Sequence, residues 1–195
     1  TIRRRLPPRN VPGGLLNLRA FQSAAFSTYC FSGFLTFLGI YTVLTYIDIF
    51  ATSVGVPADF SFYLVSITNA ASIAGRYISG VLCDRMGPMN VMIPFTFLAG
   101  ALTYAWPFAS GTFASLISNP MMALGETGDV GRRLGMYMSI IALGAVAGPP
   151  VSGAILKATG GYEAMGFYAG TMVMLGVVFM IVARRCALGQ WWGKF

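Results

Sequence analysis

The sequence predicts an all-α membrane protein with six transmembrane helices, and three observations support this prediction. First, 56% of the 195 residues are hydrophobic and only 10% are charged, which is too little charge to cover a water-soluble domain. Second, the uncharged runs suit spanning helices of about 20 residues and do not alternate as membrane β-strands would. Third, small basic clusters separate these runs, as topology signals do. The net charge of +7 therefore indicates no nucleic-acid partner, because it forms no single basic face.

The first two predicted helices follow from the positions of charged residues. No charge lies between Arg19 and Asp48, so the first span covers residues 20–47. The second span covers residues 60–82 and contains one charge, Arg76. A charge inside a span is unusual, so this residue becomes a candidate for function.

The remaining four spans are less evenly defined. Residues 86–125 form a run of 40 residues without a charge, which is too long for one span and barely long enough for two. Pro and Gly residues at 106–111 predict a break there. The fourth span, residues 110–125, would then be about 24 Å long, short of a hydrocarbon core of ~30 Å, so we expect it to be short or incomplete. The last two spans cover residues 134–156 and 164–183.

The distribution of basic residues favours six spans over five. Residues 1–19 form a basic segment, and residues 20–195 form the helix bundle. With six spans only Lys157 falls on the side opposite the other basic loop residues, and by the positive-inside rule both termini are cytoplasmic. Five spans would place Arg132 and Arg133 outside. We expect a multi-pass protein of the lipid bilayer, in the plasma membrane rather than an organelle membrane.

The sequence offers little material for catalysis or metal binding. It has no histidine, and its three cysteines lie far apart without a CxxC spacing, so we expect no metal site and no cofactor. No pair of carboxylates enters a span, so a buried general acid and base cannot be assembled. An enzyme is therefore not expected.

A compact motif follows the second span, in the sequence GVLCDRMG from Gly80 to Gly87. Its two glycines permit close helix approach and a tight turn. Asp84 can face the positive N-terminal end of a neighbouring helix, and Arg85 can reach headgroups or a carboxylate. We expect this motif to form a short cytoplasmic loop that controls packing and gating.

The fifth span carries a stripe of small residues. Gly144, Gly148 and Ser152 are four residues apart and share one helix face. Such a stripe lets two helices pack closely, and this is its more common role. The adjacent Pro149 and Pro150 weaken the helix locally, so a bend that acts as a hinge in gating is the alternative.

These features together resemble the C-terminal six-helix half of a fungal monocarboxylate-transporter-like member of the major facilitator superfamily. The resemblance implies that the spans are helices seven to twelve of twelve, and that two six-helix bundles rock around a central site. The partner of this chain would then be an N-terminal six-helix half or a second copy of itself. The residues that carry the resemblance are FLGIYTVLTYID (37–48), residues 59–94, ETGDVGRRLGM (126–136) and ALGAVAGPPVSGAIL (142–156).

Two departures from the family pattern stand out. Pro88-Met89 replaces the basic residues that usually follow the last glycine of the loop motif. In addition, members of the family that this chain resembles carry a longer segment at the place of Ala109-Ser110, so that a dozen or more residues are missing here. This difference agrees with the short fourth span.

Arg76, Asn69 and Ser72 are the candidate substrate contacts. A guanidinium inside a span should face a cavity or a partner, and its planar fork suits a carboxylate. The alternative is that Arg76 reaches toward the cytoplasmic surface from a packing position. Asn69 lies two turns earlier on nearly the same face, where it either binds substrate or bonds another helix. The second span resembles the eighth helix of monocarboxylate transporters, in which an aspartate stands four residues before an arginine at the position of Arg76. Here that place is Ser72, so proton coupling through it does not transfer.

Five charged residues near the predicted cytoplasmic side form a candidate gating network, with plain surface charge as the alternative. They are Asp84, Glu126, Asp129, Arg132 and Arg133.

The predicted function is transport of a small organic anion such as a monocarboxylate, as the C-terminal half of a facilitator. The alternative is a truncated, transport-inactive membrane fragment with a structural or assembly role.

Overall fold

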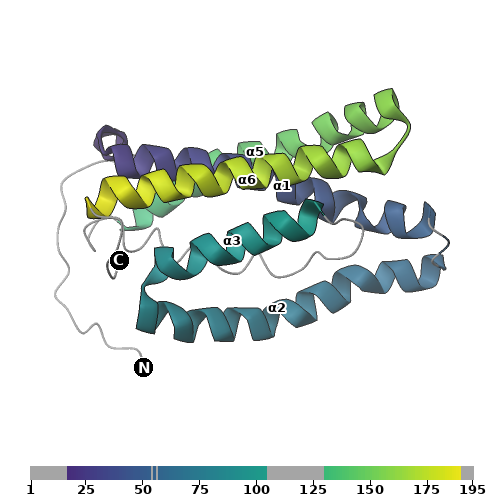
Figure 1. Ribbon diagram of the computed structural model, residues 1–195, viewed down its shortest axis with the longest axis horizontal. Helices are drawn as coiled ribbons and strands as arrows, with labels where there is room; N and C mark the ends of the chain where they lie inside the picture. Colours follow the sequence, from purple (N-terminus) through teal and green to yellow (C-terminus); the bar gives the residue numbers. More distant parts are fainter. Residues whose placement is uncertain (1–16, 54, 56, 105–129, 190–195) are drawn as a thin grey trace.

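Every regular element in the described part of the chain is helical. The computed structural model describes residues 17–53, 55, 57–104 and 130–189. A short 3₁₀ helix, η1, comes first, and five α-helices follow (Figure 1). Their bounds are η1 Leu18–Gln22, α1 Ala24–Ser53, α2 Ala58–Met86, α3 Pro88–Tyr104, α5 Val130–Thr159 and α6 Tyr162–Leu188. The predicted fourth span at 110–125 lies outside the described residues, as does nearly all of the basic segment 1–19.

The helices extend beyond the predicted spans. α1 continues five residues past Asp48, and α5 begins three residues before Arg133. At these two ends the predicted bounds were too narrow, because charges mark the edge of the apolar core and the helical hydrogen bonds continue into the polar interface. At its other end α1 begins at Ala24, four residues after the predicted start at residue 20. The predicted order of the helices is otherwise retained.

Three described helices are long and apolar enough to cross a membrane by length and composition. They are α1, α6 and the part of α5 from Gly131 to Thr159. The helix α3 has 17 residues and is therefore about 26 Å long. The helix α2 has 29 residues, but polar groups including Arg76 interrupt its apolar sequence. The described residues thus form an all-helical bundle with three candidate membrane spans, whereas six complete spans are not shown.

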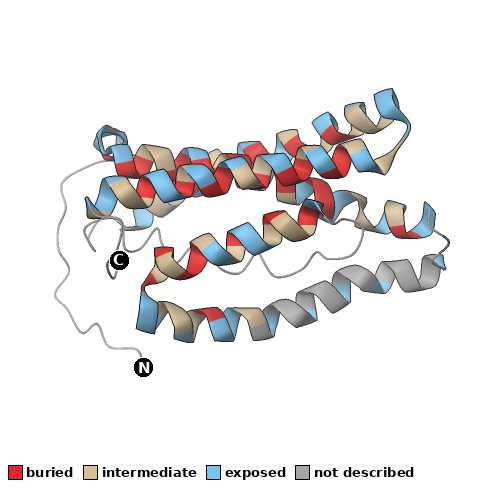
Figure 2. Cartoon of the chain, viewed as in Figure 1, coloured by how far each residue is buried: buried red, intermediate tan, exposed pale blue. Residues whose placement is uncertain are grey.

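The helix α1 occupies the centre of the bundle. It packs against α5 and α6, while α3 packs against α6 and α2 (Figure 1). Glycines allow the closest approach between α1 and α6: a Cβ at Gly39 would clash with the carbonyl oxygen of Ala169, and the carbonyl of Gly176 accepts a hydrogen bond of 2.7 Å from Ser32 Oγ. Buried residues accordingly follow the contacts of these helices (Figure 2).

The core at one end of the bundle is rich in aromatic and sulfur-containing side chains. The rings of Tyr29 and Tyr137 stack with centroids 5.1 Å apart, and the Tyr29 hydroxyl donates to Met92 Sδ at 3.4 Å. Met89 and Met180 belong to the same buried cluster. These contacts join α1, α3, α5 and α6 into one body.

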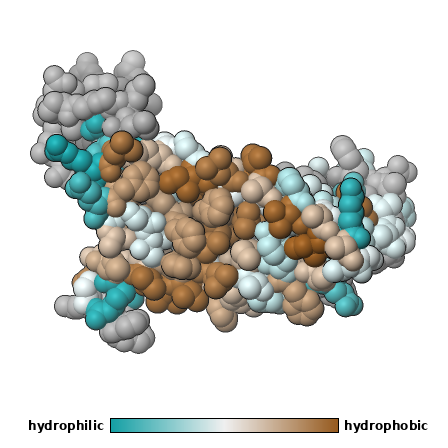
Figure 3. All heavy atoms as spheres, turned by 90° about the horizontal axis from the view of Figure 1, so that it is seen from above, coloured by the Kyte–Doolittle hydropathy of each residue, from teal (hydrophilic) through white to brown (hydrophobic). Residues whose placement is uncertain are grey.

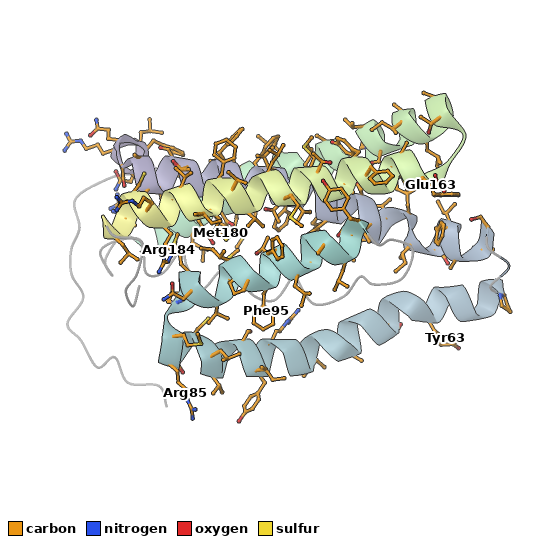
Figure 4. All side chains as sticks on the ribbon, in the orientation of Figure 1. Tyr63, Arg85, Phe95, Glu163, Met180 and Arg184 are labelled. Atoms are coloured by element: carbon orange, nitrogen blue, oxygen red, sulfur yellow. The ribbon has the colours of Figure 1, made fainter. Side chains whose placement is uncertain are left out.

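The surface changes character along the bundle. Apolar atoms gather in a middle belt, and hydrophilic atoms gather toward the two ends (Figure 3). Arg85 and Arg184 lie at one end and Glu163 lies at the other (Figure 4). We call the first the arginine-rich end. From the helix directions, its described charged residues are Arg19, Asp84, Arg85, Arg132, Arg133, Arg184 and Arg185.

Candidate functional site

Arg76 lies well inside α2. It stands ten residues before the end of the helix at Met86, which is about 15 Å along the axis. Its side chain is exposed, and so are those of Ile73 and Tyr77. The described part of the chain therefore leaves this face of α2 uncovered.

The other two candidate contacts lie on the same helix. Asn69 and Ser72 are seven and four residues before Arg76, so the α-helix places all three positions along one face. The side chains of Asn69 and Ser72 are outside the described part of the structure. The geometry thus aligns the three backbone positions, and the predicted substrate contacts stay a prediction.

The two sides of α2 differ in what they face, because one side is turned toward α3 and the other away from the bundle. Phe95 of α3 points toward α2, whereas Tyr63 and Arg85 point away from the other helices (Figure 4). The outer side of α2 therefore carries Tyr63 and, in the last turn of the helix, Arg85.

The motif from Gly80 to Gly87 is almost entirely helical, which corrects the prediction of a loop. Asp84 and Arg85 form the last turn of α2, and Gly87 is the one residue between α2 and α3. Gly87 has φ +90°, which favours glycine, and its N–H donates to the Cys83 carbonyl at 2.9 Å. Pro88 then begins α3, where its missing N–H has no consequence. By contrast, a Cβ at Gly80 would meet no described atom within 4 Å.

A hydrogen-bonded bridge joins three helices at the arginine-rich end. Arg184 Nε on α6 donates to Asn90 Oδ1 on α3 at 2.8 Å, and Asn90 Nδ2 donates to the Met86 carbonyl at the end of α2, also at 2.8 Å. Sequence reasoning missed Asn90. The available signal was an amide side chain in the first turn after a Gly-Pro helix start, at the polar end of a span.

The predicted charge network is described only in part. Arg132 and Arg133 are half-buried at the start of α5, and Asp84 is exposed at the end of α2. Glu126 and Asp129 lie outside the described residues. The gating role of these five residues therefore stays a prediction.

The small residues of α5 pack directly on α1. A Cβ at Gly144 would lie 2.5 Å from the Phe34 carbonyl oxygen, and one at Gly148 would lie 2.5 Å from that of Leu38. One turn further on, the hydroxyls of Thr42 and Ser152 share a hydrogen bond of 2.6 Å. This stripe is a backbone-to-backbone helix contact.

The two prolines lie beside this contact without ending the helix. α5 is assigned as α-helix through Pro149 and Pro150. The Tyr46 hydroxyl of α1 donates to the Pro149 carbonyl at 3.1 Å. The prolines thus adjoin the α1 contact, and their predicted hinge role stays untested.

No protein-family model matches the chain. Curated relatives are nevertheless similar over most of its length. A protein named as a major facilitator superfamily transporter of Aspergillus flavus is 30% identical over 97% of this chain and 47% of its own length. An aspyridones efflux protein of Emericella nidulans is 27% identical over 94% of this chain and 41% of its own. A riboflavin transporter of Saccharomyces cerevisiae is 28% identical over 81% of this chain and 34% of its own.

The chain belongs to the major facilitator superfamily. The predicted superfamily is therefore confirmed, and its relatives are transporters and not enzymes, as expected. The chain spans less than half the length of each of these three relatives. The superfamily builds its substrate site between two halves near the middle of the membrane. The face of α2 that the described residues leave uncovered is thus the candidate site.

Proposed function

We propose that the chain acts as the C-terminal half of a transporter for a small organic anion such as a monocarboxylate, with Arg76 as the anion contact. The exposed guanidinium about 15 Å from the end of α2 is the observation that carries this proposal. A permanent charge at that depth is unfavourable against lipid, so it requires a partner or an aqueous path. A carboxylate matches the two parallel donors of a guanidinium.

Two further features support the same assignment. Asn69 and Ser72 occupy positions on the Arg76 face of α2, where an amide and a hydroxyl would add hydrogen bonds to a bound solute. The names of the relatives include an efflux protein for aspyridones and a riboflavin transporter, which supports a small organic solute in general. The monocarboxylate is the narrower proposal.

The polarity of the bundle supports a definite orientation. We propose that the arginine-rich end lies in the cytoplasm, with both termini on that side, and that the protein works in the plasma membrane. The partner that covers the Arg76 face would be an N-terminal six-helix half or a second copy of the chain.

Uptake of radiolabelled lactate by membrane vesicles tests the function. Vesicles would contain the chain together with an N-terminal half, expressed as one protein. Arg76→Ala should lower uptake at least about tenfold, because a hydrogen-bonded charge contributes roughly 1.5–3 kcal/mol. Lys157→Ala, which removes an exposed charge at the opposite end, should leave uptake unchanged. Equal amounts of both variants in the membrane are the necessary control, and normal uptake by Arg76→Ala would reject the assignment.

A membrane protein with a structural or assembly role and no transport activity is the second candidate. Expressing residues 1–195 alone, and again beside a separately expressed N-terminal half, separates the two candidates. Uptake only in the second case supports the half-transporter. Absence of uptake in both cases supports a structural or assembly role.

A further inference from the structure

The last turns of α6 place an arginine on the outward face of the helix. Arg185 lies three residues after Val182 and seven after Val178, so the α-helix places the three positions along one face. Val178 and Val182 are exposed by 54% and 44%, whereas Met180 and Ala183 on the opposite side are buried. The outer face of α6 is thus an exposed apolar strip that ends at a guanidinium.

The charges around Arg185 are mostly positive. The described residues at the arginine-rich end include six arginines and one carboxylate, which belongs to Asp84 on α2. The described carboxylates of α1 and α6 are Asp48 and Glu163, and both lie toward the opposite end of the bundle. Even a complete ion pair at Asp84 would therefore leave a surplus of positive charge, which attracts anions.

The two consecutive arginines of α6 lie on different surfaces. Arg184 is turned about 100° from Arg185 around the helix axis, and its Nε donates to Asn90 Oδ1 of α3 at 2.8 Å. The Nη1 of Arg185 donates instead to the carbonyl of Gly189, just beyond the helix. Arg184 therefore holds α3, whereas Arg185 stays at the end of the apolar strip.

The short helix η1 adds a mixed apolar and basic surface at the same end. Ala20 of η1 and Ala183 of α6 belong to one buried cluster, and η1 lies beside the end of α6 (Figure 1). Leu18 is exposed by 69%, and Arg19 next to it is also exposed. An apolar side chain beside a basic one suits the headgroup level of a bilayer. This end of the bundle therefore fits an amphipathic ligand.

We infer that the outer face of α6 binds an anionic phospholipid, with the headgroup at Arg185 and an acyl chain along Val182 and Val178. A phosphate ion matches the charge but not the apolar strip, and a neutral lipid matches the strip but not the charge. Each basic residue near the membrane surface strengthens the binding of anionic lipid about fivefold. This lipid site is independent of the transported solute.

Quenching of a fluorescent label by lipid tests the preference for anionic lipid. The full transporter, with its native cysteines replaced, would carry bimane on Val182→Cys in a phosphatidylcholine bilayer. Phosphatidylserine with a nitroxide on its acyl chain should quench the label with an apparent affinity about fivefold higher than nitroxide phosphatidylcholine. Equal quenching by the two lipids would overturn the inference.

Phe167→Cys provides the matched control position. Phe167 is exposed by 60% and lies 18 residues before Arg185, which is about five turns, so it shares the same face of α6 at the opposite end. Both nitroxide lipids are present in both leaflets, so orientation of the protein does not affect the comparison. The two lipids should quench this label equally, and a phosphatidylserine preference as large as at Val182→Cys would contradict a site at Arg185.

Two arginine variants separate a defined site from general attraction to a basic surface. Arg185→Ala should remove the phosphatidylserine preference at Val182→Cys. Arg85→Ala removes the same charge from α2, on the other side of α3, and should change the preference less than about twofold, because salt screens distant exposed charges (Figure 4). An equal loss in both variants would show that lipid is attracted diffusely and would overturn the site.

Inorganic phosphate separates a lipid site from a site for a soluble anion. Millimolar phosphate should leave the quenching by nitroxide phosphatidylserine unchanged, because it makes no contact with the apolar strip. Displacement of the lipid by phosphate would show that the arginine-rich end binds a soluble anion, and the lipid assignment would then be wrong.

Discussion

At the scale of single residues, the glycines of this chain differ sharply in what surrounds them. Gly144 and Gly148 touch the backbone of α1, where a Cβ would lie 2.5 Å from a carbonyl oxygen. Gly80 is also helical, yet a Cβ there would meet no described atom within 4 Å. The same residue type thus has a packing role in one helix and none among the described contacts of another.

This contrast predicts opposite effects for one substitution. Gly148→Ala should lower the free energy of unfolding by about 1–3 kcal/mol, because the Leu38 backbone has little freedom to move. Gly80→Ala should leave stability unchanged or raise it by up to about 1 kcal/mol, because alanine favours the helix. Denaturation of the purified protein in detergent micelles measures both. Equal effects in the two variants would argue against backbone contact at Gly148.

At the scale of elements, the ends of α2, α3 and α6 are held together by a turn and two hydrogen bonds. Gly87 reverses the chain in one residue, and Asn90 then bonds to both Met86 and Arg184. The bond from Arg184 crosses 94 residues of sequence. These contacts hold the arginine-rich end of α3 against α6. They also place α2, which carries Arg76, beside these two helices.

A double-mutant cycle measures this bridge. Asn90→Ala and Arg184→Ala should each destabilise the protein, and their effects should be non-additive by about 1 kcal/mol, a usual value for a partly exposed hydrogen bond. The cycle of Asn90→Ala with Lys157→Ala, at the opposite end, should be additive. Additivity in the first cycle as well would show that the bond contributes nothing to stability.

The elements also show which features sequence alone could predict. The spans of α1, α5 and α6 follow from uncharged runs, and the α5 stripe follows from the spacing of Gly144 and Gly148, because both signals are local. The partner of that stripe on α1 and the Asn90–Arg184 bond depend on tertiary packing, which no local pattern specifies. Arg76 could be found as a charge within a span, but its exposure depends on how α2 packs in three dimensions.

At the scale of the whole molecule, charge and hydropathy are arranged along one axis. The described arginines outside α2 gather with Arg85 at one end, and an apolar belt separates them from the end that holds Lys157 and Glu163. An excess of arginine at one end is the signal that determines orientation during insertion. The fold therefore carries a topology prediction that does not depend on the substrate.

Native Cys186 provides a direct probe of that topology. It is exposed, and it follows Arg184 and Arg185 in the last turns of α6 at the arginine-rich end. With Cys30 and Cys83 replaced by serine, Cys186 should react with a membrane-impermeant maleimide only after the plasma membrane is permeabilised. In a variant with Cys186 also replaced, Ala158→Cys, exposed at the opposite end of α5, should react in intact cells. Because both sites are exposed, a difference between them reports the side of the membrane, and the reverse pattern would place the arginine-rich end outside.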